Sequence, residues 1–190
     1  MASRSWVLTG APGSGKTEIL DELRGDLRCV DEPARRVLAE ERACGGAGTP
    51  ERDPGRFVHL MLQLAIADHR RALATNGPTL FDRGIPDCVA YARYLGVDGD
   101  PSVAASDRSR YHGEVLLLEP WKAIYTTDDE RTMSFADTVT FHEALVDAYT
   151  LVGYRMVVVP RASTEERAAF VMARLLGRER RPRLKAPWSG

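Results

Sequence analysis

The chain has 190 residues, which suits one domain with a hydrophobic core of its own. Hydrophobic residues make up 44% of the chain and charged residues 28%, an ordinary balance for a globular protein in water. Because the formal net charge is only -1, no overall positive field attracts nucleic acid or a membrane surface, and we expect neither as a partner.

The three cysteines, Cys29, Cys44 and Cys88, are far apart in the sequence and form no CxxC pair. An odd, scattered set argues against a disulfide framework and a zinc site, and it is typical of a reducing compartment. No stretch approaches the roughly 20 apolar residues that a membrane-spanning helix needs. The first apolar run is too short for a signal peptide, so we expect a cytoplasmic protein.

An apolar run at Ser5–Gly10 predicts a strand, and the segment after it carries Ile19, Leu20 and Leu23 on one helical face. Between them, residues 10–17 read GAPGSGKT and fit the pattern GxxxxGK[ST] without a gap. In this context the glycines let backbone N–H groups face phosphate oxygens at a helix N-terminus. We predict a P-loop whose nucleotide-binding residues are Gly10, Ala11, Pro12, Gly13, Ser14, Gly15, Lys16 and Thr17.

The P-loop predicts ATP and Mg²⁺ as cofactors, because Lys16 would reach the β- and γ-phosphates and the Thr17 hydroxyl would bind the metal. The alternative is a glycine-rich turn that contains a lysine by chance, and it does not explain the spacing or the strand-to-helix context. A GTPase is disfavoured because an NKxD motif is impossible: Asn76 is the only asparagine, and Gly77 follows it.

Further along the chain, four more apolar runs predict strands at 27–32, Thr79–Asp82, 113–119 and 155–160. They are continuous rather than alternating, as expected for strands that are covered on both faces. Segments with helical spacing separate them, so strand and helix alternate from start to finish. This pattern predicts an α/β domain of three layers over residues 1–177, with a parallel sheet.

Two stretches depart from this alternation. Residues 43–54 are rich in Gly and Pro and are expected to form a mobile loop, and the basic tail at 178–190 is expected to be disordered. A capping-box pattern joins Ser163 to Glu166 and predicts the start of the last helix there.

The run Thr79–Asp82 ends in a carboxylate. Ligands of open α/β sheets bind beyond the carboxyl ends of the strands, and a nucleotide on a P-loop needs a partner for its metal. We therefore predict that Asp82 joins Thr17 as a magnesium ligand. In the alternative reading, Asp82 only caps the turn that follows its strand.

Two short motifs resemble known kinases. Residues 29–36, CVDEPARR, resemble the Glu-Pro segment of deoxynucleoside kinases, and residues 81–84, FDRG, resemble the Asp-Arg or Glu-Arg motif of the nucleoside and thymidylate kinase superfamily. Together with the P-loop, LEPW at 118–121 and DER at 129–131, they make the chain similar to a bacterial family of AAA-type P-loop ATPase/kinase domains related to the ribosylnicotinamide kinase domain. The resemblance implies a P-loop NTPase fold with five parallel strands in the kinase-like order 2-3-1-4-5 and a small lid at 121–133.

The same resemblance implies roles for several residues. Glu32 would be the base on the acceptor hydroxyl, although it could instead be a charge at a helix N-terminus beside Pro33. Arg83 would contact the substrate or pair with Glu32. Asp82 stands where deoxynucleoside kinases often have Glu, so it could bind metal, act as the base, or both. Arg131 in the lid would stabilise the transferring phosphoryl group, in preference to Lys122.

Three further residues complete the predicted site. Arg161 follows the fifth strand, where the kinases that the chain resembles contact adenine, and we assign it to the nucleotide. Asp87 and Tyr91 lie one helical turn apart after Arg83 and could bind a polar acceptor. Tyr91 is equally compatible with packing in the core.

Together these residues predict a phosphotransferase, which moves the γ-phosphate of ATP to a hydroxyl or phosphate of a small molecule. A nucleoside-like metabolite or an antibiotic would suit such a site. The alternative is a nucleotide-binding regulatory ATPase without a small-molecule acceptor. The sequence leaves a homodimer open. The catalytic residues that we predict are Lys16, Glu32, Asp82, Arg83 and Arg131.

Overall fold

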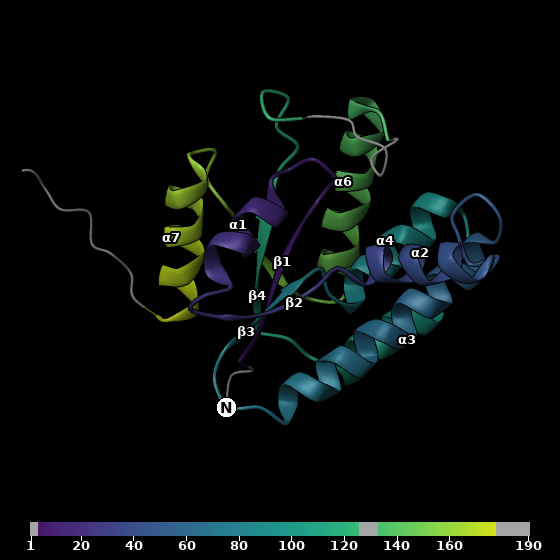
Figure 1. Ribbon diagram of the computed structural model, residues 1–190, viewed down its shortest axis with the longest axis horizontal. Coiled ribbons are helices and arrows are strands. Elements are labelled where there is room, and N and C mark those ends of the chain that lie inside the picture. The colour runs from purple at the N-terminus through teal and green to yellow at the C-terminus, as the bar shows by residue number, and fades with distance from the viewer. Residues whose placement is uncertain (1–3, 126–132, 178–190) are drawn as a thin grey trace, which may run out of the picture.

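The structure is a computed structural model that describes residues 4–125 and 133–177. Its centre is a parallel five-stranded sheet in the order β2-β3-β1-β4-β5 (Figure 1). The strands are β1 (Ser5–Gly10), β2 (Arg28–Val30), β3 (Thr79–Asp82), β4 (Glu114–Leu118) and β5 (Arg155–Val158). The predicted fold class and strand order are therefore confirmed.

Seven helices are present among the described residues. They are α1 (Lys16–Leu23), α2 (Pro33–Cys44), α3 (Pro54–Leu73), α4 (Ile85–Leu95), α5 (Asp100–Arg108), α6 (Phe135–Leu151) and α7 (Thr164–Leu175). The capping box predicted at Ser163 is present, since its side chain accepts from the Glu166 N–H and the Glu166 carboxylate accepts from the Ser163 N–H. None of these helices is long and apolar enough to cross a membrane.

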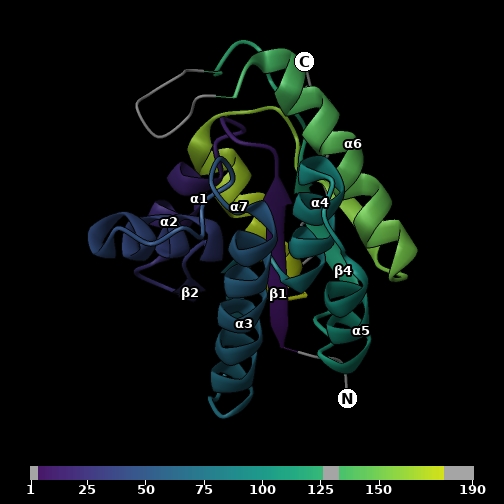
Figure 2. The ribbon, with the colours of Figure 1, turned by 90° about the vertical axis from the view of Figure 1, so that its right-hand side faces the viewer.

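The helices cover both faces of the sheet (Figure 2). Neighbouring residues of β1 point to opposite faces: Val7 packs in a core with α3, α4 and α6, whereas Leu8 packs with α1 and α7. Because every central strand is buried on both faces, its apolar run is continuous rather than alternating. Burial of these two cores supplies the main driving force for the fold.

Several predicted boundaries were wrong. Strand β2 stops at Val30, two residues short of the prediction, because Glu32 is already the N-cap of α2 and Pro33 occupies its first turn. The loop predicted at 43–54 is shorter than expected, since α2 continues through Cys44 and α3 begins at Pro54.

The connection that remains, residues 45–53, is held by hydrogen bonds around Glu41. The buried Glu41 carboxylate accepts from the N–H of Gly48 at 2.6 Å and pairs with Arg56 at 3.4 Å. The Gly48 N–H, and then Arg56, hold the pKa of Glu41 below its usual value. The expectation of a mobile loop came from composition, which does not show that a neighbouring helix supplies an acceptor.

The parallel strands place their carboxyl ends on one edge of the sheet. The P-loop follows β1, Glu32 follows β2, and Asp82 ends β3, so the predicted site residues meet at this edge. Most of the predicted lid, including Arg131, and the predicted tail at 178–190 lie outside the described residues.

Candidate functional site

The P-loop connects β1 to α1 and depends on its glycines. Gly13 and Gly15 have φ values of 75° and 83°, in the left-handed region that other residues rarely adopt. A Cβ on Gly10 would lie 2.5 Å from the backbone oxygen of Leu118. The turn therefore needs glycine for its backbone angles and for the close approach of β4, and the predicted loop is built as a phosphate cradle.

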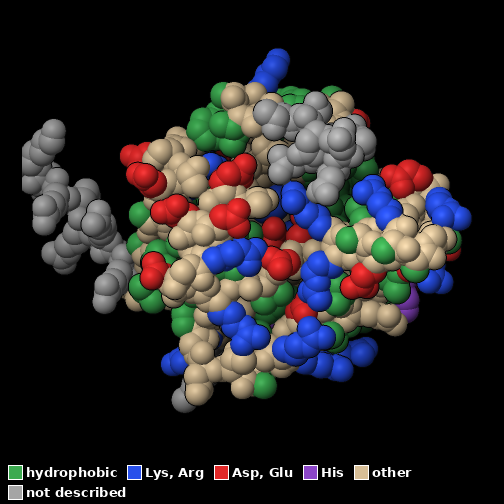
Figure 3. Space-filling view, viewed as in Figure 1, with side chains coloured by type: hydrophobic (Ala, Val, Ile, Leu, Met, Phe, Trp, Pro, Cys, Tyr) green, Lys and Arg blue, Asp and Glu red, His purple; other side chains and the backbone are tan. Residues whose placement is uncertain are grey.

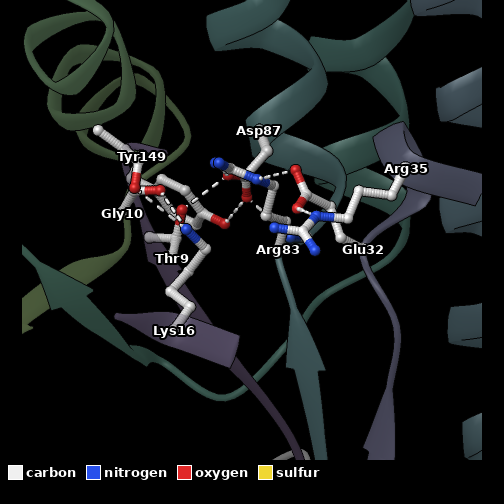
Figure 4. Close-up of polar contacts among 10 residues, drawn as sticks. Thr9, Gly10, Lys16, Glu32, Arg35, Arg83, Asp87 and Tyr149 are labelled. Carbon is white, nitrogen blue, oxygen red and sulfur yellow. Dashed lines mark hydrogen bonds and ion pairs between the residues drawn. The ribbon is translucent and has the colours of Figure 1, made fainter. Parts of the chain in front are cut away.

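Lys16 is the first residue of α1, and its side chain is buried inside this cradle. Its Nζ donates to the backbone oxygens of Gly10 at 2.9 Å and Ala11 at 3.2 Å (Figure 4). Burial, and then the charge of Arg83, lower the pKa of Lys16 to about 8, although Asp82 and Glu32 oppose the shift. An ammonium group that is held in the cradle in this way is well placed for an arriving phosphate oxygen.

Asp82 is buried at the end of β3, and its Oδ1 has no hydrogen-bond partner among the described residues. Burial, and then the charge of Glu32, raise its pKa to about 6. A buried carboxylate oxygen without a donor is costly unless a cation or water satisfies it. The described residues hold no cluster of three metal-ligating side chains. This donor set fits Mg²⁺, which usually takes one or two carboxylates and completes its shell with phosphates and water.

Glu32 lies between two arginines. Its Oε1 accepts from Arg83 Nε at 2.6 Å, and Oε2 lies 3.3 Å from Arg35 Nε. Burial alone would raise the pKa of Glu32, but Arg83, Lys16 and Arg35 together lower it below its usual value. Glu32 is the N-cap of α2, as the alternative reading expected, and it also lines the pocket beside the P-loop. Its role as a base stays a prediction.

Arg83 is the central cation of the site. It follows β3 with a φ of 69°, and its N–H continues the β1–β3 ladder by donating to Leu8 at 3.0 Å. The guanidinium is 1% exposed and lies 5.7 Å from the ring centre of Tyr91 and 5.5 Å from that of Phe141. A left-handed backbone outside glycine costs on the order of 1 kcal/mol, and here it aims the side chain at Glu32.

Asp87 is not in the acceptor position that we predicted. Its carboxylate accepts from Thr9 Oγ1 at 2.7 Å, the Gly84 N–H at 2.7 Å and Arg83 Nη1 at 3.0 Å, and also from the Tyr149 hydroxyl (Figure 4). Asp87 is 1% exposed and does not line the pocket. With four donors already bound, its carboxylate holds Arg83 in place from behind.

We expect Asp87→Asn to destabilise the fold by about 3–5 kcal/mol, because it leaves the buried Arg83 cation with one carboxylate instead of two. Urea unfolding measures this effect. The matched variant Tyr149→Phe removes one neutral donor from the same carboxylate and should cost only about 1–2 kcal/mol. Equal losses from the two variants would contradict the charge-pairing role of Asp87.

A pocket of about 240 Å³ joins these elements. One wall is the P-loop, with Gly13, Gly15, Lys16 and Thr17, and the opposite wall is α2, which presents Arg35, Leu38, Ala39 and Arg42. Glu32, Arg83, Tyr91 and Phe57 also line it. Figure 3 shows acidic and basic side chains side by side near the centre of this face. The pocket therefore connects the phosphate cradle to a space large enough for a small molecule.

The remaining predicted residues are placed differently. Tyr91 lines the pocket, as expected for a substrate contact, and its burial raises the pKa of its phenol. Arg161 does not line the pocket, and its Nη2 donates to the backbone oxygen of Pro120 at 3.1 Å. It therefore lies beside the segment that follows β4.

Some residues of the site escaped prediction. Arg35 and Phe57 line the pocket, and a signal for Arg35 existed, because it lies one helical turn after Glu32. Arg167 of α7 donates to the backbone oxygen of Ser14 in the P-loop at 3.2 Å. Its separation of 153 residues from Ser14 left no local pattern that could reveal this contact.

A family model described as an AAA domain matches residues 5–167. Among solved structures, deoxyadenosine kinase from M. mycoides has a TM-score of 0.62 at 13% identity, covering 91% of this chain and 99% of that one. Thymidylate kinase from Ehrlichia chaffeensis has a TM-score of 0.60 at 17% identity, covering 92% and 100%. NadR in complex with NR has a TM-score of 0.70 at 16% identity, covering 92% of this chain but only 51% of NadR. No curated protein matches the sequence.

Proposed function

Since the chain belongs to the AAA-domain family and has the fold of P-loop nucleoside and nucleotide kinases, we propose that it is an ATP-dependent phosphotransferase acting on a small molecule. One observation carries the proposal: the P-loop lysine, Lys16, and the buried carboxylate of Glu32 line the same pocket. A switch ATPase has no need of a carboxylate-lined pocket beyond its nucleotide, whereas a kinase needs one for its acceptor.

The nucleotide would lie on the P-loop with its γ-phosphate toward this pocket. The loop N–H groups and the Lys16 ammonium would hold the phosphates. Thr17 and Asp82 would hold Mg²⁺, which would neutralise phosphate charge. Asp82 is suited to this task because its free oxygen is buried and lacks a donor.

Glu32 would accept the proton of the acceptor hydroxyl while the new O–P bond forms and the bond to ADP breaks. Its Arg83 partner is fixed, but Arg35 is 45% exposed and can turn toward solvent to free Oε2. The lowered pKa makes Glu32 a weak base before the reaction. That suffices for a loose transition state, in which the hydroxyl loses its proton late and orientation matters most.

The far wall of the pocket supports a nucleoside-like acceptor. Phe57 and Tyr91 meet edge to face with ring centres 5.8 Å apart, and Arg35 and Arg42 line the α2 side. Aromatic surface beside cations suits a flat ring that carries polar or anionic groups. We therefore favour a nucleoside or nucleotide over an aliphatic alcohol, and an antibiotic hydroxyl remains a candidate in the same screen.

The deciding experiment measures ADP release with ATP, Mg²⁺ and one candidate acceptor at a time, across nucleosides, ribosylnicotinamide-like compounds, nucleoside monophosphates and antibiotics. A kinase should hydrolyse ATP slowly alone and release ADP much faster with its acceptor, which then gains the mass of one phosphate. If no acceptor raises ADP release, while ATP binds, the regulatory ATPase is the better assignment.

Replacing Asp82 should stabilise the nucleotide-free fold but weaken magnesium-dependent ATP binding. The pKa of Asp82 is raised from 3.8 to about 6, so the ionised carboxylate destabilises the nucleotide-free fold. This destabilisation is complete above about pH 6 and diminishes as the pH falls toward 3.8. Asp82→Asn should therefore raise the melting temperature at pH 8 and raise it less at pH 4.5. The same variant should need more magnesium for ATP binding. An unchanged magnesium titration would assign Asp82 a structural role.

A further inference from the structure

Arg167 brings a cation from α7 into contact with the P-loop. Its Nη1 donates to the backbone oxygen of Ser14 at 3.2 Å, and a Cβ added to Gly15 would lie 2.6 Å from the same nitrogen. Its guanidinium carbon lies 5.7 Å from the ring centre of Trp121. The Arg167 side chain is therefore packed between the phosphate cradle and an aromatic ring, and the residue is only 5% exposed.

The charge of Arg167 is unpaired within the described part of the chain. Its Nε is buried without a hydrogen-bond partner, and none of the ion pairs among residues 4–125 and 133–177 involves it. Burial lowers the pKa of Arg167, and the charge of Glu18 compensates only in part. Arg83, the other deeply buried arginine of the described residues, instead lies between two carboxylates. A buried cation that has no anion among the described residues is costly unless an anion from elsewhere compensates it.

The position of Arg167 identifies the kind of anion that would compensate it. Ser14 and Gly15 belong to the loop whose N–H groups face the nucleotide phosphates, and a guanidinium binds phosphate oxygens with several donors at once. Arg167 does not line the acceptor pocket, toward which the transferred phosphate would point. A contact of Arg167 with the nucleotide would therefore fall on the phosphates that stay with the nucleoside as ADP.

We propose that Arg167 is a nucleotide-positioning residue, which supplies a second cation beside Lys16 to the phosphates retained in ADP. Through Ser14 it also holds the loop carbonyl outward, so that the loop N–H groups stay directed inward. The inference rests on the proposed nucleotide binding and adds to it a contribution from the C-terminal helix. Arg167 should therefore affect nucleotide affinity more than the rate of the chemical step.

The test compares wild type with Arg167→Met and Arg167→Lys by calorimetric titration with ADP and Mg²⁺ and by melting temperature. Loss of a charged hydrogen-bonding group should weaken ADP binding by about tenfold or more in the Met variant, and less in the Lys variant. The KM for ATP should rise in parallel. The nucleotide-free Met variant should melt at or above the wild-type temperature, because it no longer buries an unpaired charge.

Arg174→Met is the matched control, since Arg174 lies on the same helix and pairs with Glu114 away from the loop. If Arg167 had only a structural role, the pattern would be the reverse. Arg167→Met would then melt at a lower temperature or fail to fold, and Arg167→Lys would bind ADP with unchanged affinity. If wild type binds ADP and Arg167→Met binds it equally well, this inference alone is wrong. If wild type binds no nucleotide, the proposed function itself fails.

Discussion

Lys16→Met is expected to abolish phosphoryl transfer and most of the stabilisation that nucleotide binding provides. Among residues 4–125 and 133–177, Lys16 is the only lysine that lines the pocket, and its Nζ already lies within the P-loop against Gly10 and Ala11. Removing one preorganised cation from a transferring phosphoryl group costs about 10²–10³ in turnover. A ligand at 100 times its Kd stabilises a fold by about 2.7 kcal/mol, so the thermal shift with ADP and Mg²⁺ should shrink measurably.

The pH dependence of ADP affinity provides a second test of the role of Lys16. Because the pKa of Lys16 is lowered to about 8, the ammonium loses its proton as the pH rises through that value, and ADP affinity should fall in wild type. In Lys16→Met this dependence should disappear. Arg24→Met is a suitable control, since Arg24 lies at the opposite end of α1 and pairs with Asp21 in solvent. Wild-type turnover in Lys16→Met would refute the nucleotide site.

Glu32→Gln is expected to separate nucleotide binding from chemistry. The amide keeps the size of the side chain and an oxygen for Arg83, so the thermal shift with ADP should remain when each variant is compared with its own nucleotide-free state. Loss of the proton acceptor should lower acceptor-dependent turnover by about 10²–10⁴. The variant should also melt earlier, because Arg83 loses one of its two charge partners.

Arg35→Met tests whether Glu32 acts as the base or only takes part in the ion pairs. It removes the exposed partner of Glu32 and leaves the carboxylate and Arg83 in place. If Glu32 is the base, this variant should keep far more turnover than Glu32→Gln. Normal acceptor-dependent turnover in Glu32→Gln would exclude Glu32 as the base and leave it as the N-cap of α2.

Prediction from sequence succeeded where local pattern and chemistry point the same way. The P-loop and the strand ends are continuous in the chain, and parallel topology then brings Lys16, Glu32 and Asp82 to one edge of the sheet. Asp87 was misplaced for the opposite reason. Its position one helical turn before Tyr91 was correct, but its carboxylate is occupied by Thr9 and Tyr149, which come from β1 and α6 and are distant in sequence.

From the chain alone we could predict the alternation of strands and helices, the phosphate cradle and the carboxylates at the ends of β2 and β3, because each depends on neighbouring residues. What those groups face became known from the folded structure. It placed Arg83 between Glu32 and Asp87, and it brought Arg167 from the last helix to the first loop. The physical reason is that burial, charge pairing and the pKa of a side chain depend on surroundings in space, which no local pattern in the chain contains.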